Sequence, residues 1–576
     1  MDYKVLYENW LTNPKLSASG VSELKAIEDN EKEIEYRFGK ELEFGTAGMR
    51  GIIGMGTNMM NVYTVRRATQ GLADYIKTLG QEAMNRGVAI SYDTRRCSID
   101  FALASCGVLI ANGIHTYIYK EGRPVSMLSY AVRKLNCIAG IMITASHNPK
   151  EYNGYKVYGE DGAQMSIEAT REVVNYISKI TDYFSVSYTA IENIGKAGFL
   201  GCDILKKGFE KKYYKELLKL GLSKKAVKRE GKNVKLVYTP VHGTGYVPVT
   251  TVLEKLKINV SVVDEQVMPD TEFSTVEVPN PEYKETLTLA IKRANEINAD
   301  VVFGTDPDCD RLGVALRNKD GEFFALTGNQ VGVLLLNYVL SRLKSEKALK
   351  GDEFAVKSFV STGLAKAVAD SYGVELKEVP VGFKFIGEKI KIAEETKKGT
   401  FVFGFEESCG YLRGTHARDK DAVVASMLFA EMVCYYNSVG VSIFEVLEEI
   451  YNKFGYCLDY TQSINYSGLH AMDEMNQAVN AMSTKKIEKI DIHNIVAVRN
   501  YQTGERTLSN GAVEKLEYSG LNCLYYEFEN GGFICLRPSG TEPKLKIYYS
   551  MTGKDKARAE ENLSKVKKSF EEILRS

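Results

Sequence analysis

Apolar and polar residues alternate along this chain in a way that defines three similar blocks. In the first block, apolar residues recur at helical intervals over residues 64–79, and Gly80 closes the pattern. Short apolar runs at 88–92, 116–119 and 137–143 predict buried strands, with helices expected between them. This alternation of strands and helices favours α/β domains in which helices cover a sheet.

The second and third blocks repeat this order. Strands are predicted at 234–238, 260–263, 300–305, 355–360, 375–379 and 401–405, and helices near 252–256, 286–297, 331–343 and 364–372. Each block ends in an apolar strand that leads into a polar loop. Because ligand sites in α/β sheets lie outside the carboxyl ends of strands, we expect chemistry in the loops of Ser146, Asp306 and Glu406.

The remaining chain, from about residue 466, has a different pattern. Strands are predicted at 533–536 and 545–549, and the last helix carries Leu563, Val566, Phe570 and Ile573 on one face. We therefore expect a smaller C-terminal α+β domain after three α/β domains, a number that 576 residues accommodate. The expected boundaries are 1–205, 206–325, 326–465 and 466–576.

Composition narrows the class of protein. Lys+Arg and Asp+Glu are equal at 74 each, so no overall field indicates nucleic acid or a membrane as partner. No apolar run reaches the ~18 residues of a membrane span, and the first ten residues lack the pattern of a signal peptide. The ten cysteines form no Cys-x-x-Cys pair. We expect a cytoplasmic protein, either a monomer or a small homo-oligomer.

Residues 305–311 place Asp306, Asp308 and Asp310 at alternate positions. We expect an extended segment that projects the three carboxylates to one side, where a cation would offset their repulsion. Oxygen ligands without His or Cys suit Mg²⁺. A calcium EF-hand would require Gly in place of Arg311, and an aspartyl phosphatase would require Thr in place of Asp310. A solvated acidic turn is the remaining alternative.

Residues 142–156 present Ser146 at the end of an apolar strand. His147, Asn148 and Lys156 follow, and no acidic partner of a hydrolase triad accompanies them. A phosphoserine is nearly a dianion at neutral pH and requires such donors around it. The segment therefore favours a serine that holds a phosphoryl group over one that carries out acyl transfer.

Two further loops contain polar side chains that could bind a ligand. Residues 406–410 combine Glu406 and Ser408, acceptors that suit sugar hydroxyls, although an acidic loop is also typical of a solvated surface. Residues 537–543 combine Arg537 with two hydroxyls and a glycine between two strands, which favours an anion site over a plain hairpin turn.

The serine segment resembles, almost residue for residue, the phosphoserine loop of the α-D-phosphohexomutases. The resemblance includes the other three loops and extends from Phe44 to the C-terminal helix, with smaller matches at residues 44–51, 93–96, 238–243 and 381–384. It implies three related α/β domains and a C-terminal domain around a central cleft. It also implies a serine that is phosphorylated in the resting enzyme.

The resemblance further implies a Mg²⁺-dependent transfer of phosphate between C1 and C6 of glucose, with glucose 1,6-bisphosphate as intermediate. Ser146 and the three aspartates would hold the metal, Arg311 would stabilise the transferring group, and Lys156, His147 and Arg50 are candidates for the proton shuttle. The residues expected to bind the phosphosugar are Glu406, Ser408, Lys384, Arg537, Ser539, Gly540 and Thr541.

Three alternatives stay open at this point. The first is a phosphopentomutase and the second a phosphomannomutase. Tyr411 stands where mannose- and glucosamine-phosphate mutases of this family have His, which favours glucose over those sugars. The third is a phosphosugar-binding protein without catalysis, which the retained serine and aspartates disfavour.

Overall fold

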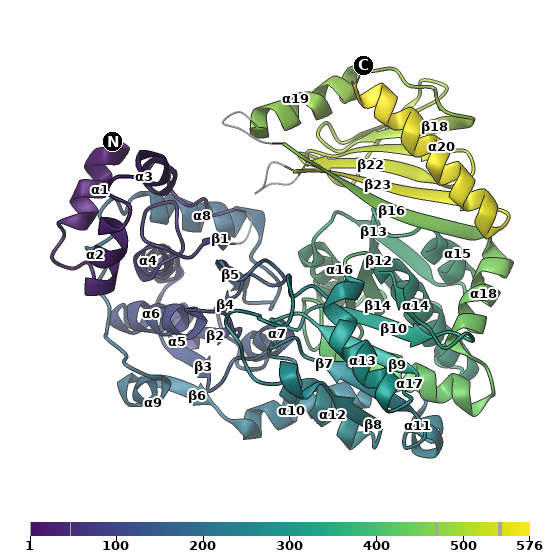
Figure 1. Cartoon of the computed structure of the whole chain (residues 1–576), viewed down its shortest axis with the longest axis horizontal. Coiled ribbons are helices and arrows are strands. Elements are labelled where there is room, and N and C mark those ends of the chain that lie inside the picture. Colours follow the sequence, from purple (N-terminus) through teal and green to yellow (C-terminus); the bar gives the residue numbers. More distant parts are fainter. Residues whose placement is uncertain (1, 46–47, 467–470, 539–543, 576) are drawn as a thin grey trace. The chain divides into compact units, whose positions relative to one another are not determined.

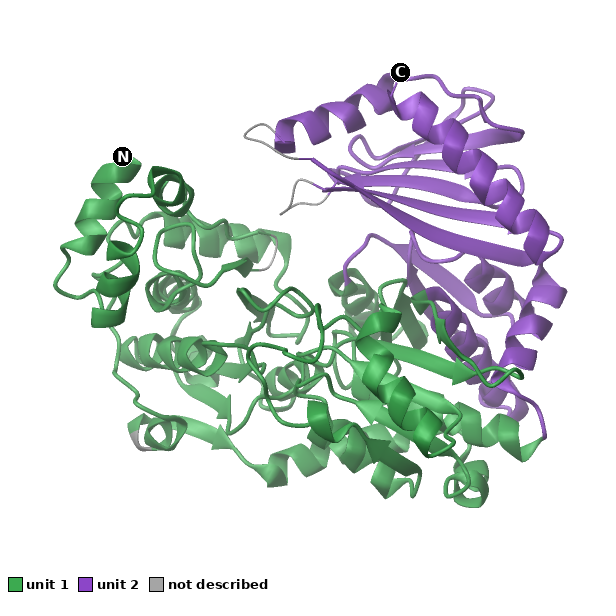
Figure 2. Cartoon of the chain, viewed as in Figure 1, with its two compact units in different colours: residues 1–328, 383–439 green, residues 329–382, 440–576 purple. Residues whose placement is uncertain are grey.

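The chain falls into two compact units in the computed structural model, which describes residues 2–45, 48–466, 471–538 and 544–575. Unit 1 comprises residues 1–328 and 383–439, and unit 2 comprises residues 329–382 and 440–576 (Figure 1, Figure 2). The four-domain boundaries expected from the sequence stay predictions.

Unit 1 begins with a six-stranded mixed sheet. Its strand order is β1 (Gly48–Ile52), β5 (Tyr152–Gly159), β4 (Ala139–Ile143), β2 (Val88–Tyr92), β3 (Thr116–Tyr119) and β6 (Cys202–Leu205). The covering helices include α4 (Val62–Thr78), α6 (Ser98–Ala111), α7 (Val125–Lys134) and α8 (Ile167–Ser178). The central strands β2 and β4 are buried along their whole length, as the apolar runs predict.

A five-stranded sheet follows in the same unit. Its order is β11 (Phe323–Leu326), β10 (Leu312–Arg317), β9 (Val301–Thr305), β7 (Lys235–Thr239) and β8 (Asn259–Val262). Helices α12 (Tyr246–Lys255) and α13 (Thr288–Glu296) pack on its strands. Unit 1 also contains α16 (Phe383–Thr396), β14 (Thr400–Glu406), β15 (Gly410–Leu412) and α17 (Ala422–Ser438).

Each of the three chemistry-bearing loops joins a buried strand to an antiparallel neighbour. These antiparallel pairs are β4–β5, β9–β10 and β14–β15. Each loop contains a residue other than glycine with left-handed backbone, namely Ser146 (φ 52°), Cys309 (φ 50°) and Cys409 (φ 60°). Such conformations are uncommon away from glycine and often mark functional sites. Each loop therefore connects two paired strands and does not lead into a helix.

Unit 2 is built on two groups of strands. In the parallel pair β12 (Glu353–Ser358) and β13 (Glu375–Val379), helix α15 (Leu364–Ser371) packs on β13 and on α18 (Ile443–Phe454). Helix α14 (Gly328–Ser345) precedes β12 in the chain. An antiparallel sheet follows in the order β16 (Tyr456–Asn465), β23 (Lys544–Gly553), β22 (Phe533–Pro538), β21 (Leu524–Phe528), β18 (His493–Asn500), β19 (Glu505–Leu508) and β20 (Val513–Lys515), with β17 (Lys489–Ile490) beside β18. Helices α19 (Ala471–Thr484) and α20 (Lys556–Arg575) cover one face of it, and Val566 and Phe570 are buried there as predicted (Figure 1).

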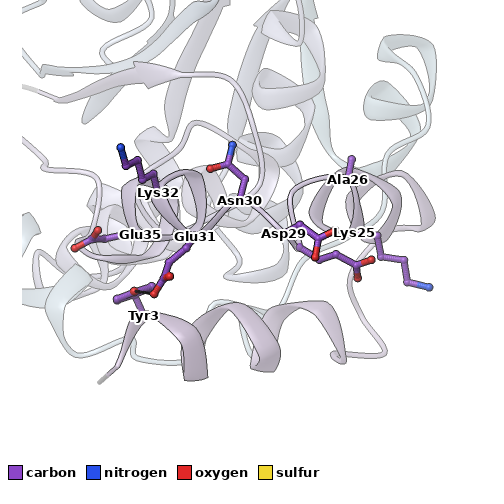
Figure 3. Close-up of a pocket in the computed structure, with 9 residues that line it drawn as sticks. Tyr3, Lys25, Ala26, Asp29, Asn30, Glu31, Lys32 and Glu35 are labelled. Carbon is purple, nitrogen blue, oxygen red and sulfur yellow. Dashed lines mark hydrogen bonds between the residues drawn. The ribbon is translucent and has the colours of Figure 1, made fainter.

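Three N-terminal helices that the sequence analysis does not anticipate pack on unit 1. They are α1 (Tyr3–Leu11), α2 (Ala18–Lys25) and α3 (Glu31–Phe38). The single tryptophan, Trp10, holds them together, since its ring lies 5.1–5.7 Å from the rings of Phe38, Tyr63, Tyr183 and Phe184. An open hollow of about 650 Å³ on these helices is lined mainly by acidic and basic side chains such as Glu31 and Lys32, and contains none of the expected site residues (Figure 3).

Among the described residues, no single helix is long and apolar enough to cross a membrane. The successive helices α17 and α18 reach the required length and composition only when they are taken together.

Candidate functional site

Ser146 lies in the β4–β5 loop and is buried, with 3% of its surface exposed. Its backbone amide donates to Oγ1 of Thr144 at 2.7 Å, and Thr144 in turn donates to a carboxylate oxygen of Asp93 at 2.6 Å. Its hydroxyl lies 3.2 Å from Nδ1 of His147. The loop therefore fixes the serine in one orientation through bonds to its backbone, so its hydroxyl points in a defined direction.

Arg95 holds the same loop from the protein interior. Its fully buried guanidinium donates to the carbonyls of Ser146 and Asn148, and also to that of Pro149 at 2.8 Å. Asp93 lies 3.3 Å from Nε of Arg95 and balances its charge. In the sequence, residues 93–96 are only one of the smaller matches to the family named above. The structure reveals that Asp93 and Arg95 support the loop although neither touches the serine hydroxyl.

Two further cationic residues from the sequence analysis lie beside this loop. Arg50, on β1, donates to the side-chain oxygen of Asn148 at 2.8 Å. Lys156, on β5, reaches across to Oδ2 of Asp308 at 3.1 Å. The pairing of β1 with β5 brings these two residues to the same part of the sheet, where Gly48 is the register partner of Lys156.

The aspartate loop is a tight turn, so the expectation of an extended segment is wrong. Oδ1 of Asp306 accepts the amides of Asp310 and Arg311, both at 3.0 Å, and the amide of Cys309 donates to the carbonyl of Asp306. The three carboxylates converge because the loop folds back on Asp306, and not because alternate residues of a strand share a face. Carboxylate oxygens of the three aspartates lie within 4.8 Å of one another, and all three residues are buried.

This cluster fits a metal ion. Among the described residues, neither Oδ1 of Asp308 nor Oδ1 of Asp310 has a hydrogen-bond partner, although both atoms are buried. Buried acceptors without donors are costly, and three carboxylates at this spacing suit a hard cation. The Ser146 hydroxyl donates to Oδ2 of Asp306 at 2.9 Å, so a phosphoryl group on Ser146 would lie beside the cluster.

The surrounding charges shift the pKa values of two of the three carboxylates in opposite directions. Burial, together with the charges of Asp310 and Asp308, raises the pKa of Asp306 well above its ordinary value. Burial also acts to raise the pKa of Asp308, but Lys156, a hydrogen bond with Asp306 and the charge of Lys420 together outweigh burial, and the pKa falls below the ordinary value. A divalent cation would offset the repulsion among the three carboxylates, which contributes to the raised pKa of Asp306.

Lys420, which the sequence analysis missed, completes the charge balance. Its Nζ lies 3.2 Å from Oδ2 of Asp310, and 14% of its side chain is exposed. Burial acts to lower the pKa of Lys420, yet Asp310 and Glu406 raise it above the ordinary value. The only sequence signal is its charged setting, residues 418–421, between a buried strand and an apolar helix.

The Glu406 loop is joined directly to the aspartate loop. Arg311 and Gly410 form a β-bridge, and the amide of Leu312 donates to the carbonyl of Cys409 at 3.0 Å. Glu406 ends β14 and is buried, whereas Ser408 is half-buried. The serine, aspartate and Glu406 loops therefore form one continuous site in unit 1.

Arg311 lies at the edge of this site. Its guanidinium pairs with Glu282, and its Nε lies 3.9 Å from both Asp306 and Asp310. Tyr411 is fully buried and donates to the carbonyl of Gly328 at 3.2 Å, so its side chain belongs to the core. Its replacement of a His in the sequence pattern therefore bears less on sugar choice than the pattern indicated.

Lys384, which was also expected to bind the ligand, lies in unit 1 but outside this cluster. Lys384 lies in the first turn of α16 and lines a different cavity of about 630 Å³, together with Met165 and Glu388. Burial lowers its pKa. Arg537 lies on β22 in unit 2. Ser539, Gly540 and Thr541 lie outside the described residues.

Comparison with known proteins identifies the group to which these loops belong. The phosphoglucomutase/phosphomannomutase α/β/α domain models match at residues 41–184 (domain I), 211–321 (domain II) and 327–454 (domain III). A phosphoglucomutase of Staphylococcus haemolyticus is 35% identical over 519 residues, which cover 90% of this chain and 91% of that protein. A phosphoglucomutase of Staphylococcus saprophyticus is 33% identical over 569 residues, 98% of each chain.

Solved structures share the fold at lower identity. Parafusin, a phosphoglucomutase from Paramecium, superposes with a TM-score of 0.65 at 16% identity, covering 93% of this chain and 95% of its own. A phosphoglucomutase/phosphomannomutase family protein from Burkholderia thailandensis gives 0.64 at 17% identity, covering 92% and 96%. The expected fold class, three α/β domains with a C-terminal β-rich domain, is confirmed. The matched domains and the similarity to full-length relatives show that this chain belongs to the α-D-phosphohexomutase family and is a mutase of the isomerase class.

Proposed function

We propose that the chain interconverts glucose 1-phosphate and glucose 6-phosphate through phospho-Ser146 and glucose 1,6-bisphosphate. The observation that carries the sugar assignment is the similarity, over nearly the whole chain, to proteins named phosphoglucomutase. The proposed chemistry is supported by the position of Ser146, whose hydroxyl lies 2.9 Å from an aspartate of the carboxylate cluster.

In the proposed reaction, O6 of glucose 1-phosphate attacks phospho-Ser146, the bond from phosphorus to the serine oxygen breaks, and the O6 proton passes to a base. In the second half, the C1 phosphoryl group of the bisphosphate moves to Ser146 and a proton returns to O1. Both halves need a group that exchanges a proton near the serine. His147 is supported by its 3.2 Å distance to the Ser146 hydroxyl, and Lys156 and Arg50 stay candidates.

The proposed metal is Mg²⁺, held by Asp306, Asp308, Asp310 and an oxygen of the phosphorylated Ser146. When bound, it supplies positive charge that stabilises the transferring phosphoryl group. Lys156 and Lys420 neutralise the two aspartates that they contact, and the guanidinium of Arg311 adds a third cation at the edge of the site. Preorganised charge of this kind is the main source of catalysis in phosphoryl transfer.

Recognition of the substrate is assigned to the other loops. Glu406 and Ser408 would accept hydrogen bonds from sugar hydroxyls. Lys384, together with the loop of Arg537, Ser539, Gly540 and Thr541, would bind the sugar and the phosphate that is not being transferred. These roles rest on the motifs of the family.

A direct assay tests the proposed function. Glucose 1-phosphate, mannose 1-phosphate and ribose 1-phosphate would be compared, each primed with its own bisphosphate in the presence of Mg²⁺. We expect the highest kcat/KM with glucose 1-phosphate. Ribose lacks the sixth carbon, so its distal phosphate would lie closer to the reacting one and leave polar groups of the site unpaired. A preference for ribose or mannose would replace the proposal by a phosphopentomutase or phosphomannomutase, and no turnover with any sugar would favour a phosphosugar-binding protein.

We also propose a cytoplasmic location. All ten cysteines are free thiols, nine of them buried, which favours a reducing compartment. We expect no nucleic-acid or membrane partner, and the choice between a monomer and a small homo-oligomer stays a prediction.

A further inference from the structure

Residues 264–283 of unit 1, here called the strap, connect β8 to the helical segment η3 (Lys284–Leu287). The short turn η2 (Asp264–Gln266) is the only regular element among them in the described structure. The proposed function assigns no role to this segment. Irregular connections of about 15 residues or more are uncommon within compact domains, and those that are ordered usually serve a function.

The strap is fixed to the second sheet by buried polar contacts. His242 follows β7, and its two ring nitrogens lie 2.9 Å from the carbonyl of Met268 and 2.7 Å from the hydroxyl of Thr275. Gln266 is fully buried, and its side-chain amide donates to the same Thr275 hydroxyl at 2.9 Å. The strap therefore has a defined position and does not behave as a free loop.

The middle of the strap contacts the serine loop through Phe273. Its ring lies 5.0 Å below the guanidinium of Arg95, it is 1% exposed, and its backbone is left-handed at φ 47°. A second contact, between Glu272 and Lys150, is 2.9 Å long but joins two side chains that are about half exposed. Exposed ion pairs contribute little, whereas a cation–π contact in a dry site contributes more. Phe273 is thus the main anchor.

Arg95 contacts both the Phe273 ring and the loop that carries Ser146. Its Cζ lies 5.0 Å from the ring centroid of Phe273, while its N–H groups donate to the Ser146 carbonyl and to three further carbonyls, those of Asn148, Pro149 and Tyr152. The ring therefore contacts the guanidinium without occupying the N–H groups that hold the serine loop.

The other end of the strap contacts the metal-site loop. Glu282 pairs with Arg311, whose Nε lies 3.9 Å from Asp306 and from Asp310. Residue Pro281 packs so closely on β10 that a Cβ at Gly313 would lie 2.1 Å from the Pro281 carbonyl oxygen. One segment therefore touches the loop of the nucleophile and the loop of the three aspartates.

We propose that Phe273 is a positioning residue, which holds Arg95 in the orientation that keeps the Ser146 hydroxyl on Asp306. The strap sets the separation between the serine loop and the aspartate loop, since it is attached to both. This inference rests on the proposed function only for its kinetic test.

The test compares Phe273→Leu with Phe323→Leu in the full-length protein. Phe323 is a matched control, because it is also a buried phenylalanine of the same domain with an arginine, Arg317, 4.6 Å from its ring, and it lies in the core on β11. We expect Phe273→Leu to lower kcat by about 10- to 100-fold with little change in KM, since small misplacements of reacting groups are costly. Phe323→Leu should change kcat by less than about threefold.

Hydrogen exchange provides a second readout that does not depend on activity. Amides of residues 144–152 should exchange about tenfold faster in Phe273→Leu than in the wild-type protein, and Phe323→Leu should leave them unchanged. Unchanged exchange in Phe273→Leu, or equal effects of the two substitutions, would overturn the inference. An inactive wild-type protein would contradict the proposed function alone, because the exchange comparison would still decide the role of Phe273.

Discussion

The Ser146 hydroxyl donates a 2.9 Å hydrogen bond to Oδ2 of Asp306, although the two residues follow strands of different sheets. The contact exists because two hairpin loops turn toward each other, one held by Asp93 and Arg95 and the other closed on Asp306 itself. The nucleophile and the carboxylate cluster are therefore preorganised by the fold, which reduces what must be rearranged during phosphoryl transfer.

Ser146→Ala should abolish mutase turnover and the incorporation of phosphate. Since the buried hydroxyl donates to a carboxylate, the free energy of unfolding should fall by no more than about 3 kcal/mol, which leaves the variant folded. Intact mass after incubation with glucose 1,6-bisphosphate, together with a turnover assay, checks both expectations. A variant that keeps wild-type turnover would end the phosphoserine mechanism.

Removal of the metal should stop turnover reversibly. Excess chelator should abolish activity and Mg²⁺ should restore it, because three buried carboxylates converge with two unpaired oxygens. Asp308→Asn should weaken Mg²⁺ binding, measured by titration calorimetry, by at least about tenfold, since it removes a charged oxygen ligand. Asp161→Asn, outside the cluster, is the control. Undiminished turnover in chelator would exclude a catalytic metal.

The fold was predictable where a buried element has a recognisable pattern of apolar residues in the sequence. Strands β2, β3 and β13 match the predicted bounds. The first two are short runs of mainly apolar or β-branched residues, and β13 has buried Leu376 and Val379 among charged residues. The partner strands β5 and β10 were missed: β5 contains Gly154 and Asn153, and its conformation is determined by pairing with β1 and β4. The helices around Trp10 were missed since their core is formed by aromatic residues distant in sequence, including Tyr183.

The site was predictable to the extent that its residues lie in contiguous motifs. Ser146 and the three aspartates were found for this reason, although the geometry given for the aspartates was wrong. Phe273 and Lys420 act through contacts between separate segments, so no motif indicates them. Arg95 lies in the matched segment 93–96, but its contact with the serine loop is visible only in the structure. For Lys384 the motif and the structure differ. Its motif matches the family, but its side chain lines a cavity that contains neither Ser146 nor the aspartates.

Glu378 should make unit 2 sensitive to acid. Burial acts to raise its pKa, but Lys357 and Arg499 outweigh burial and lower the pKa to about 2. The ionised form therefore stabilises the fold fully above the ordinary pKa of ~4.3, and this contribution is lost as the pH falls toward about 2. Glu378→Gln should be destabilising at pH 7, since it leaves Lys357 buried without its partner.

Urea unfolding of the wild type and of Glu378→Gln at several pH values checks the predicted direction of this pH dependence. The difference between wild type and Glu378→Gln should be largest near pH 7 and shrink between about pH 4 and 2. Glu375→Gln on the same strand β13 is the control and should have little effect at any pH, because Glu375 pairs with the partly exposed Lys377 at 3.6 Å, whereas Glu378 pairs with the buried Lys357. A difference that grows on acidification would contradict the assignment.

Lys420→Met should separate metal binding from turnover. Lys420 lies 3.2 Å from Asp310, and Asp310 and Glu406 hold its pKa above the ordinary value against the effect of burial, so it is charged throughout the working pH range. Loss of this cation leaves more negative charge around the three carboxylates, so Mg²⁺ should bind as tightly as before or more tightly. The transferring phosphoryl group, however, loses a fixed positive charge, and kcat should fall by about 30- to 1000-fold.

Titration with Mg²⁺ and steady-state kinetics on the same preparation measure the two effects. Lys391→Met is the control, because Lys391 is more exposed and lies 3.9 Å from Asp161, which is not part of the cluster. If Lys420 only held Asp310 in place as a metal ligand, metal affinity and kcat would fall together, and saturating Mg²⁺ would restore the rate. A rate that stays low at saturating Mg²⁺ identifies Lys420 as part of the charge that stabilises the transfer, a role that only its position in the fold reveals.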